Sequence, residues 1–157
     1  MIVAARPAEP ADLEALTSLV DQAAAVASDL RGGTLFLARE LSGLEILVDL
    51  PTAGDESRLV AVGTLDGVVL GVAVACVEVV GGSPLGRLQA LWVDPEARSV
   101  GVGQELLGLV ARWAADRGAE RIDAYALPGD RATKNLFESA GFSARLIVMH
   151  RAPPDRV

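Results

Sequence analysis

The sequence of 157 residues contains very few side chains of the types that form disulfide bonds or hold metals. It has a single cysteine, Cys76, and a single histidine, His150. A lone cysteine cannot form an internal disulfide, which favours a reducing compartment. Because no group of histidine, cysteine and carboxylate residues has the spacing of metal ligands, we expect no metal site. We expect Cys76 to be a small core residue and His150 to be an exposed one.

Basic charge and long apolar stretches are scarce as well. The 14 lysine and arginine residues are outnumbered by 21 aspartate and glutamate residues, and the net charge is -7. Nucleic-acid binding requires a basic face that neutralises phosphates, so we expect no nucleic-acid partner. The apolar stretch at 68–77 is too short to cross a bilayer and is interrupted by Gly71. With no signal sequence at its start, the chain is predicted to be cytoplasmic and free of membrane contacts.

The order of the predicted elements indicates one domain with a central sheet. The length suits a single domain, so we assign residues 1–151 to it and residues 152–157 to a flexible tail. Residues 35–48 could form a helix, although Gly43 interrupts their helical period. This mixed order is typical of an α/β or α+β fold. Apolar periodicity and turn residues predict strands at 2–6, 58–65, 68–80, 86–93, 121–127 and 142–150. They also predict a helix that starts at residues 11–12 and ends at the glycine pair 32–33, and further helices at 103–117 and 131–140.

A strand, a short loop and a helix start between Leu91 and Gly103 form the most informative segment. Gly101 and Gly103 lack a Cβ, so the backbone there can turn tightly and approach a ligand. The first amides of the following helix have no partner within it, and together with the helix dipole they suit a pyrophosphate. Arg98 adds positive charge to an otherwise acidic chain. The alternative is that the glycines only make a tight turn. Neither a Walker pattern nor a Rossmann fingerprint fits, since Leu106 stands where a third glycine would be.

Two motifs, in this order, resemble those of the GNAT superfamily of acyltransferases. Residues 93–103, Val-Asp-Pro-Glu-Ala-Arg-Ser-Val-Gly-Val-Gly, are similar to its acyl-CoA signature, Arg/Gln-x-x-Gly-x-Gly/Ala after a Val-x-Pro strand end. Residues 127–142 resemble its fourth-helix motif, which commonly ends Leu-Tyr-Glu-x-x-Gly-Phe and here ends Leu-Phe-Glu-Ser-Ala-Gly-Phe. The resemblance covers residues 60–150 well and residues 1–57 only in general layout. It implies a mixed, mostly antiparallel central sheet flanked by helices, with splayed fourth and fifth strands.

The resemblance also implies where acetyl-CoA would lie as a co-substrate. A bulge in the fourth strand would free backbone amides for the pantetheine arm and the thioester carbonyl, and the loop amides would hold the pyrophosphate. Lys134 could approach the phosphates or be an ordinary solvated lysine. The expected coenzyme contacts are Leu91, Trp92, Val93, Arg98, Ser99, Val100, Gly101, Val102, Gly103, Gln104, Lys134 and Phe137.

Both of the acid–base groups that many family members carry are replaced in this sequence. Arg87 occupies the position of the family's glutamate base, and Phe137 occupies the position of the tyrosine that protonates the leaving thiolate. Glu78, on the preceding strand, is a candidate catalytic or substrate-orienting group, or else a solvated edge residue. Tyr125, on the fifth strand, is a candidate acid, or else a packed tyrosine with one hydrogen bond.

Two functions are therefore open. The first is an N-acetyltransferase, in which an amine of a small molecule, peptide or protein attacks the thioester directly in a ternary complex. The second is a non-catalytic acyl-CoA-binding or regulatory module that kept the coenzyme site and lost the chemistry. The resemblance also makes a homodimer an expectation.

Overall fold

The computed structural model describes residues 1–40, 50–51 and 55–155 and is built around one five-stranded sheet. Neighbouring strands are antiparallel except for the last two, which are parallel, so the predicted mixed and mostly antiparallel sheet is confirmed. The strands lie in the order β1 (Val3–Pro7), β2 (Arg58–Leu65), β3 (Val68–Val80), β4 (Ser83–Val93) and β5 (Ile122–Ala124). The helices are α1 (Leu13–Ser28), α2 (Gly33–Glu40), α4 (Val102–Asp116) and α5 (Arg131–Ser139), with short 3₁₀ turns η1 (Pro10–Asp12) and η2 (Pro95–Ala97).

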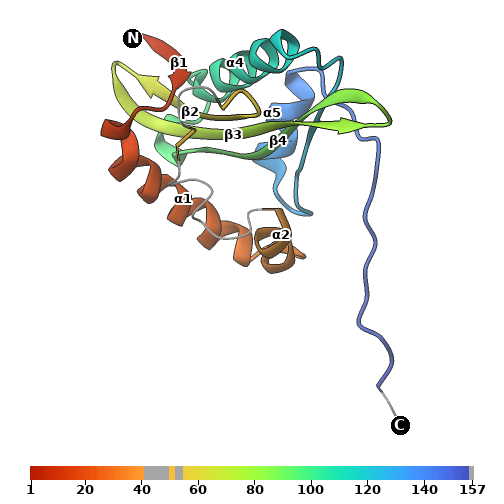
Figure 1. The fold of residues 1–157 in the computed structure, drawn as a ribbon. Helices are drawn as coiled ribbons and strands as arrows, with labels where there is room; N and C mark the ends of the chain where they lie inside the picture. The colour runs from red at the N-terminus through yellow and green to blue at the C-terminus, as the bar shows by residue number, and fades with distance from the viewer. Residues whose placement is uncertain (41–49, 52–54, 156–157) are drawn as a thin grey trace.

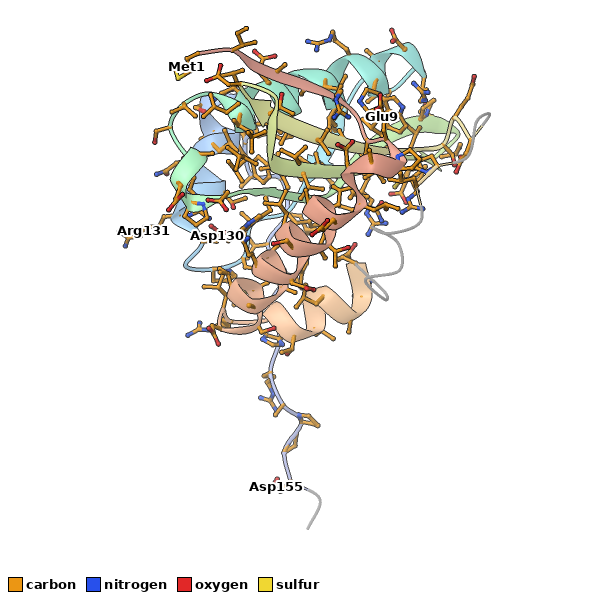
Figure 2. The ribbon with its side chains drawn as sticks, turned by 90° about the vertical axis from the view of Figure 1, so that its left-hand side faces the viewer. Met1, Glu9, Asp130, Arg131 and Asp155 are labelled. Carbon is orange, nitrogen blue, oxygen red and sulfur yellow. The ribbon has the colours of Figure 1, made fainter. Side chains whose placement is uncertain are left out.

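Helices cover both faces of this sheet. Figure 1 shows α4 on one face and α1 with α2 on the other, and Figure 2 shows the same layers after a quarter turn. Side chains of β2 and β3 alternate between the two sides. Ala61 and Ala73 belong to the core cluster with α4, whereas Val62 and Val72 belong to the cluster with α1. The central parts of β2 and β3 are therefore buried on both faces, which explains why their sequences are apolar runs without a polar face.

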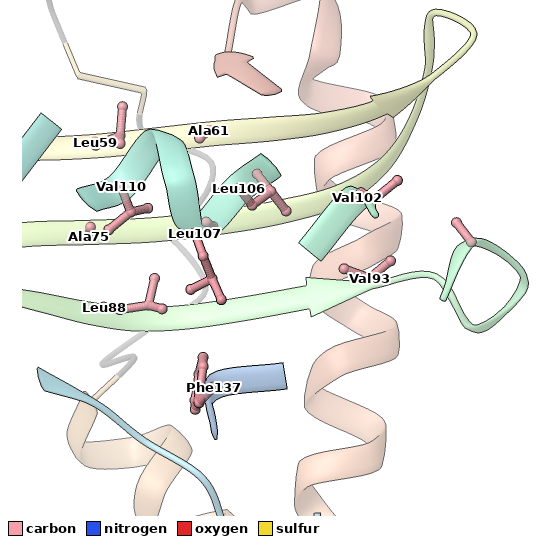
Figure 3. Packing of buried hydrophobic residues seen from close by; sticks show 12 residues of the cluster. Leu59, Ala61, Ala75, Leu88, Val93, Val102, Leu106, Leu107, Val110 and Phe137 are labelled. Carbon is pink, nitrogen blue, oxygen red and sulfur yellow. The ribbon is translucent and has the colours of Figure 1, made fainter. Parts of the chain in front are cut away.

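Glycines on the α4 side let this helix approach the sheet closely. Gly63 and Gly71 are register partners on β2 and β3. A Cβ on Gly63 would lie 2.6 Å from Cγ1 of Val102, and a Cβ on Gly71 would lie 2.9 Å from the same atom. Figure 3 shows Val102 and Leu106 within the core cluster that joins α4 to the strands. Because Val102 is the first residue of α4, the start of the helix rests directly on the sheet backbone.

β4 carries two irregularities at the end that faces this helix start. The register between β3 and β4 skips Gln89, which is an extra, bulged residue. β5 pairs with β4 only over residues 86–88, and β4 continues to Val93 without that neighbour. The predicted splaying of these two strands is confirmed, and the backbone of β4 beyond residue 88 has a free edge.

Several predicted boundaries differ from those observed. The strand predicted at 121–127 is limited to Ile122–Ala124, because β4 has diverged beyond that point. The glycine pair at 32–33 does not end a helix, since α1 ends at Ser28 and Gly33 begins α2. Of the ambiguous segment 35–48, the residues up to Glu40 are helical, and residues 41–49 lie outside the described part of the chain.

The prediction of a strand at 142–150 is wrong. These residues have no regular secondary structure, and none of them pairs with a described strand. A β-strand is stable only when its backbone groups pair with a neighbour, and a sequence reveals the preference for a strand without revealing the partner. The single domain at 1–151 and the flexible tail at 152–157 stay predictions, and residues 156–157 lie outside the described ranges.

We predict that Gly63→Ala lowers the free energy of unfolding by about 1–3 kcal/mol, because the added methyl group overpacks against Val102 and Leu106. Gly108→Ala, within α4, is the matched control. Its Cβ would meet only the end of the Arg112 side chain, at 3.3 Å, and alanine favours a helix over glycine by about 1 kcal/mol. Equilibrium unfolding in urea measures both variants. A Gly63→Ala protein as stable as the parent would contradict the close seat of α4.

Candidate functional site

The loop between β4 and α4 bends back on itself through two left-handed residues. Asp94 Oδ1 accepts a hydrogen bond from the Glu96 amide at 2.9 Å and so opens the η2 turn. Ser99 then has a φ of 69°, and Gly101, the N-cap of α4, has a φ of 102°. A φ of this size requires glycine at position 101. Turns that contain such left-handed residues can direct successive N–H groups toward one side, as anion-binding nests do.

The backbone amides of residues 99–104 are the main hydrogen-bonding resource of this loop. Among the described residues, none of these six amides has an acceptor. The first bond of the helix runs from the Glu105 amide to the Gly101 carbonyl, at 3.0 Å. The amides of the first turn of α4 also carry the positive end of the helix dipole. This arrangement can bind a phosphate in a protein whose overall charge is negative.

Arg98 supplies the positive charge of the loop and is held from two sides. Its Nε donates to the Val93 carbonyl at 3.3 Å. Its guanidinium carbon lies 4.8 Å from the centroid of the Trp92 ring, which is a cation–π contact. Arg98 is therefore fixed against the end of β4, next to the unpaired amides of the loop.

A cleft of about 520 Å³ opens beside this loop. Its size lies within the usual range for sites that bind small molecules and cofactors. The predicted coenzyme residues that line it are Leu91, Trp92, Val93, Arg98, Ser99, Gly101, Gly103 and Gln104. The lining residues that the sequence analysis missed are Ala97, Ala132, Thr133, Asn135, Leu136 and Ser139, all but the first from α5. The helical period of α5 was the available signal for them, and it could not show which face meets the cleft.

Four predicted coenzyme residues do not line this cleft. The Val102 side chain is buried in the core beneath α4, so only its backbone amide remains a candidate contact. Val100, within the loop, is half-buried. Lys134 is exposed, and its Nζ donates to Glu138 Oε1 at 2.7 Å. Phe137 is buried and lines a second cavity.

Gly103 has a packing role that the sequence does not reveal. A Cβ at this position would lie 2.7 Å from Cδ2 of Leu136. The missing side chain therefore lets α5 pack against the first turn of α4, and this packing brings α5 to the wall of the cleft. The sequence analysis explains this glycine by a ligand that approaches the backbone. The contact with α5 is a second reason, and it is sufficient by itself to explain the glycine.

A smaller and largely apolar cavity of about 80 Å³ adjoins the cleft. Leu91, Trp92 and Thr133 line both spaces, and much of the remaining wall comes from α1 and α2. Among the residues that line the smaller cavity, only Tyr125 and Asp130 are ionisable, and the Asp130 carboxylate caps α5 by accepting from the Thr133 amide at 3.1 Å. The indole N–H of Trp92 is buried without an acceptor among the described residues. One polar donor near the junction of the two spaces is therefore buried without a partner among the described residues.

Arg87 organises a polar cluster next to the smaller cavity. Its Nε donates to the Tyr125 hydroxyl oxygen at 2.9 Å. Its guanidinium also forms an ion pair with Glu40 of α2, and Nη1 lies 3.8 Å from Oε2 of Glu78. Tyr125 lines the cavity, but Arg87, Glu40 and Glu78 do not. No motif marks Glu40 in the sequence, because only the tertiary packing of α2 brings it to β4.

Other groups of chemical interest lie away from both spaces. Burial, and then the nearby Glu78 carboxylate, raise the pKa of the Cys76 thiol, which disfavours a reactive thiolate. His150 is exposed in the segment that follows α5. Within the described ranges, no three His, Cys, Asp or Glu side chains gather as metal ligands would. The helices of those same ranges are too short or too polar to span a membrane.

Comparison with known sequences gives a family for this arrangement. The model of the acetyltransferase (GNAT) family matches residues 24–142. A mycothiol acetyltransferase of Thermomonospora curvata is 32% identical over 72 residues, which make up 45% of this chain and 24% of that relative. The matched part of the chain therefore spans about a quarter of the length of this curated relative.

Solved structures with the same fold cover nearly the whole chain. The aminoglycoside acetyltransferase AAC(6')-Iy, in complex with a bisubstrate analog, superposes with a TM-score of 0.68 at 24% identity, over 98% of this chain and 100% of that one. A putative acetyltransferase from Agrobacterium tumefaciens gives a TM-score of 0.67 at 18% identity, over 96% of this chain and 99% of that one. At these identities the likeness concerns the fold alone.

We predict that Gln104→Glu weakens binding of coenzyme A about tenfold, which corresponds to about 1.4 kcal/mol. The new carboxylate would stand beside the loop amides and repel phosphates, while a negative charge in the first helical turn should not destabilise α4. Gln22→Glu, on α1 and outside both spaces, adds the same charge and should bind as the parent does. Calorimetric titration at fixed ionic strength compares the three proteins. An equal loss in both variants would mean that net charge, and not the loop, governs binding.

Proposed function

The chain belongs to the GNAT family of acetyltransferases, and on that basis we propose that it is an enzyme that transfers an acetyl group from acetyl-CoA to an amine. The observation that carries this proposal is the row of six unpaired amides at residues 99–104, beside a cleft that adjoins a second, apolar cavity. The cleft suits an anionic coenzyme, and the cavity suits the acceptor. Leu91, Trp92 and Thr133 line both spaces and would surround the reacting atoms.

The residues of the cleft fit acetyl-CoA, which supplies the acetyl group as a thioester. The amides of residues 99–104 and the guanidinium of Arg98 would hold its phosphates. The free edge of β4, from Leu91 to Val93, would hold the amide-rich arm and polarise the thioester carbonyl. Lys134, Val100 and Phe137 remain predicted contacts whose side chains lie outside the cleft wall.

The amine would attack the thioester directly while both substrates are bound. A C–N bond forms, the C–S bond breaks, the nitrogen loses a proton and the leaving sulfur gains one. Holding the two reactants together can supply about 7–11 kcal/mol of the barrier reduction. The AAC(6')-Iy structure contains the bisubstrate analog CoA-S-monomethyl-acetylneamine, and one ligand that joins both substrates supports direct transfer for this fold.

Tyr125 is the best-placed proton donor for the leaving sulfur. Arg87 Nε can only donate, so the Tyr125 oxygen must accept in their 2.9 Å hydrogen bond. The hydroxyl proton of Tyr125 is therefore not used in that bond and can be donated into the cavity that this residue lines. In this proposal Glu78, together with Glu40, holds Arg87 in place, and Arg87 in turn orients Tyr125.

The acceptor that we propose is an amine of low pKa with an apolar body. No described residue of the cavity wall has a free carboxylate that could remove a proton from an ammonium group. The amine must then arrive neutral, which about one lysine-like amine in 2,500 is at pH 7, against roughly a tenth of α-amino groups. Apolar side chains such as Phe36 and Leu37 fit an aromatic or aliphatic amine better than the polycationic aminoglycosides named for several structural neighbours.

One observation favours the second candidate function, a binding module without catalysis. Arg87 stands where the family's base would be and is occupied by two carboxylates and a phenol. Release of free thiol from acetyl-CoA in the presence of an amine panel separates the two functions. Thiol release above the rate without amine supports the enzyme. Tight coenzyme binding with no thiol release for any amine would support the module.

A cytoplasmic location and a homodimer belong to the proposal as well. The single cysteine agrees with a reducing compartment.

We predict that Tyr125→Phe lowers kcat about 10- to 30-fold and leaves the Kd of coenzyme A unchanged. Expelling a thiolate of pKa about 8.5 at pH 7 without an acid costs only about 2 kcal/mol, which sets this upper bound. Phe36→Leu is the matched control, because the Phe36 ring lies 5.9 Å from the Tyr125 ring and carries no hydroxyl. It should raise KM for the amine with little change in kcat. An unchanged kcat in Tyr125→Phe would show that Tyr125 has a packing role and does not donate the proton.

We predict that kcat/KM rises with pH up to the pKa of the free amine, because only the neutral amine is a substrate. An aryl amine or an α-amino group should therefore be preferred over an alkyl amine of pKa about 10.4 at pH 7. Rate profiles against pH for amines of matched size but different pKa test this, in the parent and in Glu78→Gln. A preference for the alkyl amine at pH 7 that Glu78→Gln abolishes would show that Glu78 is a working base.

A further inference from the structure

The extra residue in β4 changes which face of the sheet the following side chains occupy. Leu88 belongs to the core cluster that includes α4 (Figure 3). In a regular strand Ala90 and Trp92 would share its face, because side chains two residues apart point the same way. Both of them pack instead against the cluster that includes α1. The bulge at Gln89 therefore shifts the alternation by one residue and brings Trp92 to the side of the smaller cavity.

Gln89 itself faces the smaller cavity. Leu88 lies on the α4 side, so alternation places Gln89 on the α1 side, where it lines the cavity wall and is half-buried. The side-chain hydrogen bonds of this wall are made by Tyr125 and Asp130, and none among the described residues involves the Gln89 carboxamide. A carboxamide carries two N–H donors and an oxygen with two lone pairs. A polar group able both to donate and to accept thus stands in a wall that is otherwise largely apolar.

The same wall offers no free charge to a ligand. Among the described residues, it contains no lysine, arginine or histidine. Arg87, beside the cavity, already pairs with the carboxylates of Glu40 and Glu78. The Asp130 carboxylate accepts from the Thr133 amide as the cap of α5. A carboxylate on the acceptor would therefore enter an apolar space without a counter-charge, which is unfavourable. Polar recognition in this cavity has to use neutral groups.

The best complement of a carboxamide is a second amide group. One N–H donates to the carbonyl oxygen of the ligand while the carboxamide oxygen accepts from the ligand N–H, so two hydrogen bonds form together. A ligand without an amide would leave the Gln89 side chain covered and unpaired, which costs binding free energy. The α-amino group of a peptide stands next to an amide and has a pKa of about 7.7–8.0, so a useful fraction of it is neutral at pH 7.

We propose that the acceptor is an α-amino amide, and that Gln89 is the residue that recognises its amide group. The apolar side chain of the acceptor would lie against Phe36 and Leu37, and its amine would reach the junction at Trp92 and Thr133, where the thioester would lie. A small amino-acid amide and the first residue of a peptide share this chemistry. The proposal rests on the proposed function and narrows its acceptor from low-pKa amines in general to this one class.

Binding of the acetylated product tests the recognition without requiring turnover. In calorimetric titrations with coenzyme A present, N-acetyl-leucinamide should bind about tenfold more tightly than N-acetyl-leucine methyl ester, which keeps the carbonyl and the apolar side chain but lacks the N–H. Gln89→Met, an unbranched apolar replacement, should abolish this difference by weakening the amide alone. Gln22→Met, on α1 and outside both spaces, is the matched control and should keep the difference.

Thiol release from acetyl-CoA gives the second readout. The parent should use leucinamide about tenfold better in kcat/KM than leucine methyl ester, and this ratio should fall to about one in Gln89→Met. Leucinamide and leucyl-glycinamide represent the two sources of the amide, and the better of the two identifies the source. Absence of thiol release with every amine would contradict the proposed enzyme. Equal binding of the amide and ester products by the parent would contradict the role of Gln89 alone.

Gln89→Glu supplies the carboxylate that the cavity wall lacks while keeping the shape of the side chain. Because a carboxylate can take the proton of an ammonium group, the rate with isopentylamine relative to leucinamide should rise at least tenfold at pH 7. An unchanged ratio would place residue 89 away from the amine and overturn the proposal. A preference for the amide that persists in Gln89→Met would overturn it too, and the comparison of amide with ester in the parent stands even if a variant proves unstable.

Discussion

The close contact between the start of α4 and the sheet is the constraint on which the candidate site depends. Gly63 and Gly71 remove the side chains that would hold Val102 away, and Gly103 does the same for Leu136 of α5. These contacts set the first turn of α4 beside the end of β4, where the strand is bulged and has lost its β5 neighbour. Unpaired amides, a free strand edge and the α5 wall then meet in one cleft. Packing between small residues, and not a cluster of basic charge, makes this acidic protein suited to an anionic coenzyme.

In the proposed function, the replacement of the family's two acid–base groups changes the chemistry without removing it. Arg87 cannot accept a proton, but it draws Glu40, Glu78 and the Tyr125 hydroxyl into one cluster. The cavity beside this cluster is lined by apolar groups from α1 and α2. In that proposal such a site would bind a neutral amine and donate one proton to the leaving sulfur, and it would have little means of handling a cationic amine. The choice of acceptor would then be made by the amine's own pKa.

The C-terminal segment shows that an apolar pattern alone does not produce a strand. Every strand of the sheet that is apolar on both faces lies between covering helices, whereas residues 146–149 have the same composition and no cover. Their pattern predicts a strand, but in the described residues no neighbouring strand pairs with them, and a strand requires such a neighbour. The difference between prediction and structure at 142–150 therefore comes from the absence of a paired neighbour and not from the local preference of these residues.

The sequence by itself determined the two strands that are joined by the Asp66-Gly67 turn. It also determined the helix that follows Gly101 and the loop that joins this helix to β4. These features depend on local periodicity and on backbone freedom at single residues. It also carried the family motifs at 93–103 and 127–142. Only the tertiary structure decided that Val102 faces the core and not the cleft, that Glu40 reaches Arg87, and that Tyr125 lines the cavity while Glu78 does not. These facts depend on how elements distant in sequence pack against one another, and side-chain direction across such contacts is set by the neighbours and not by the residue's own local preference.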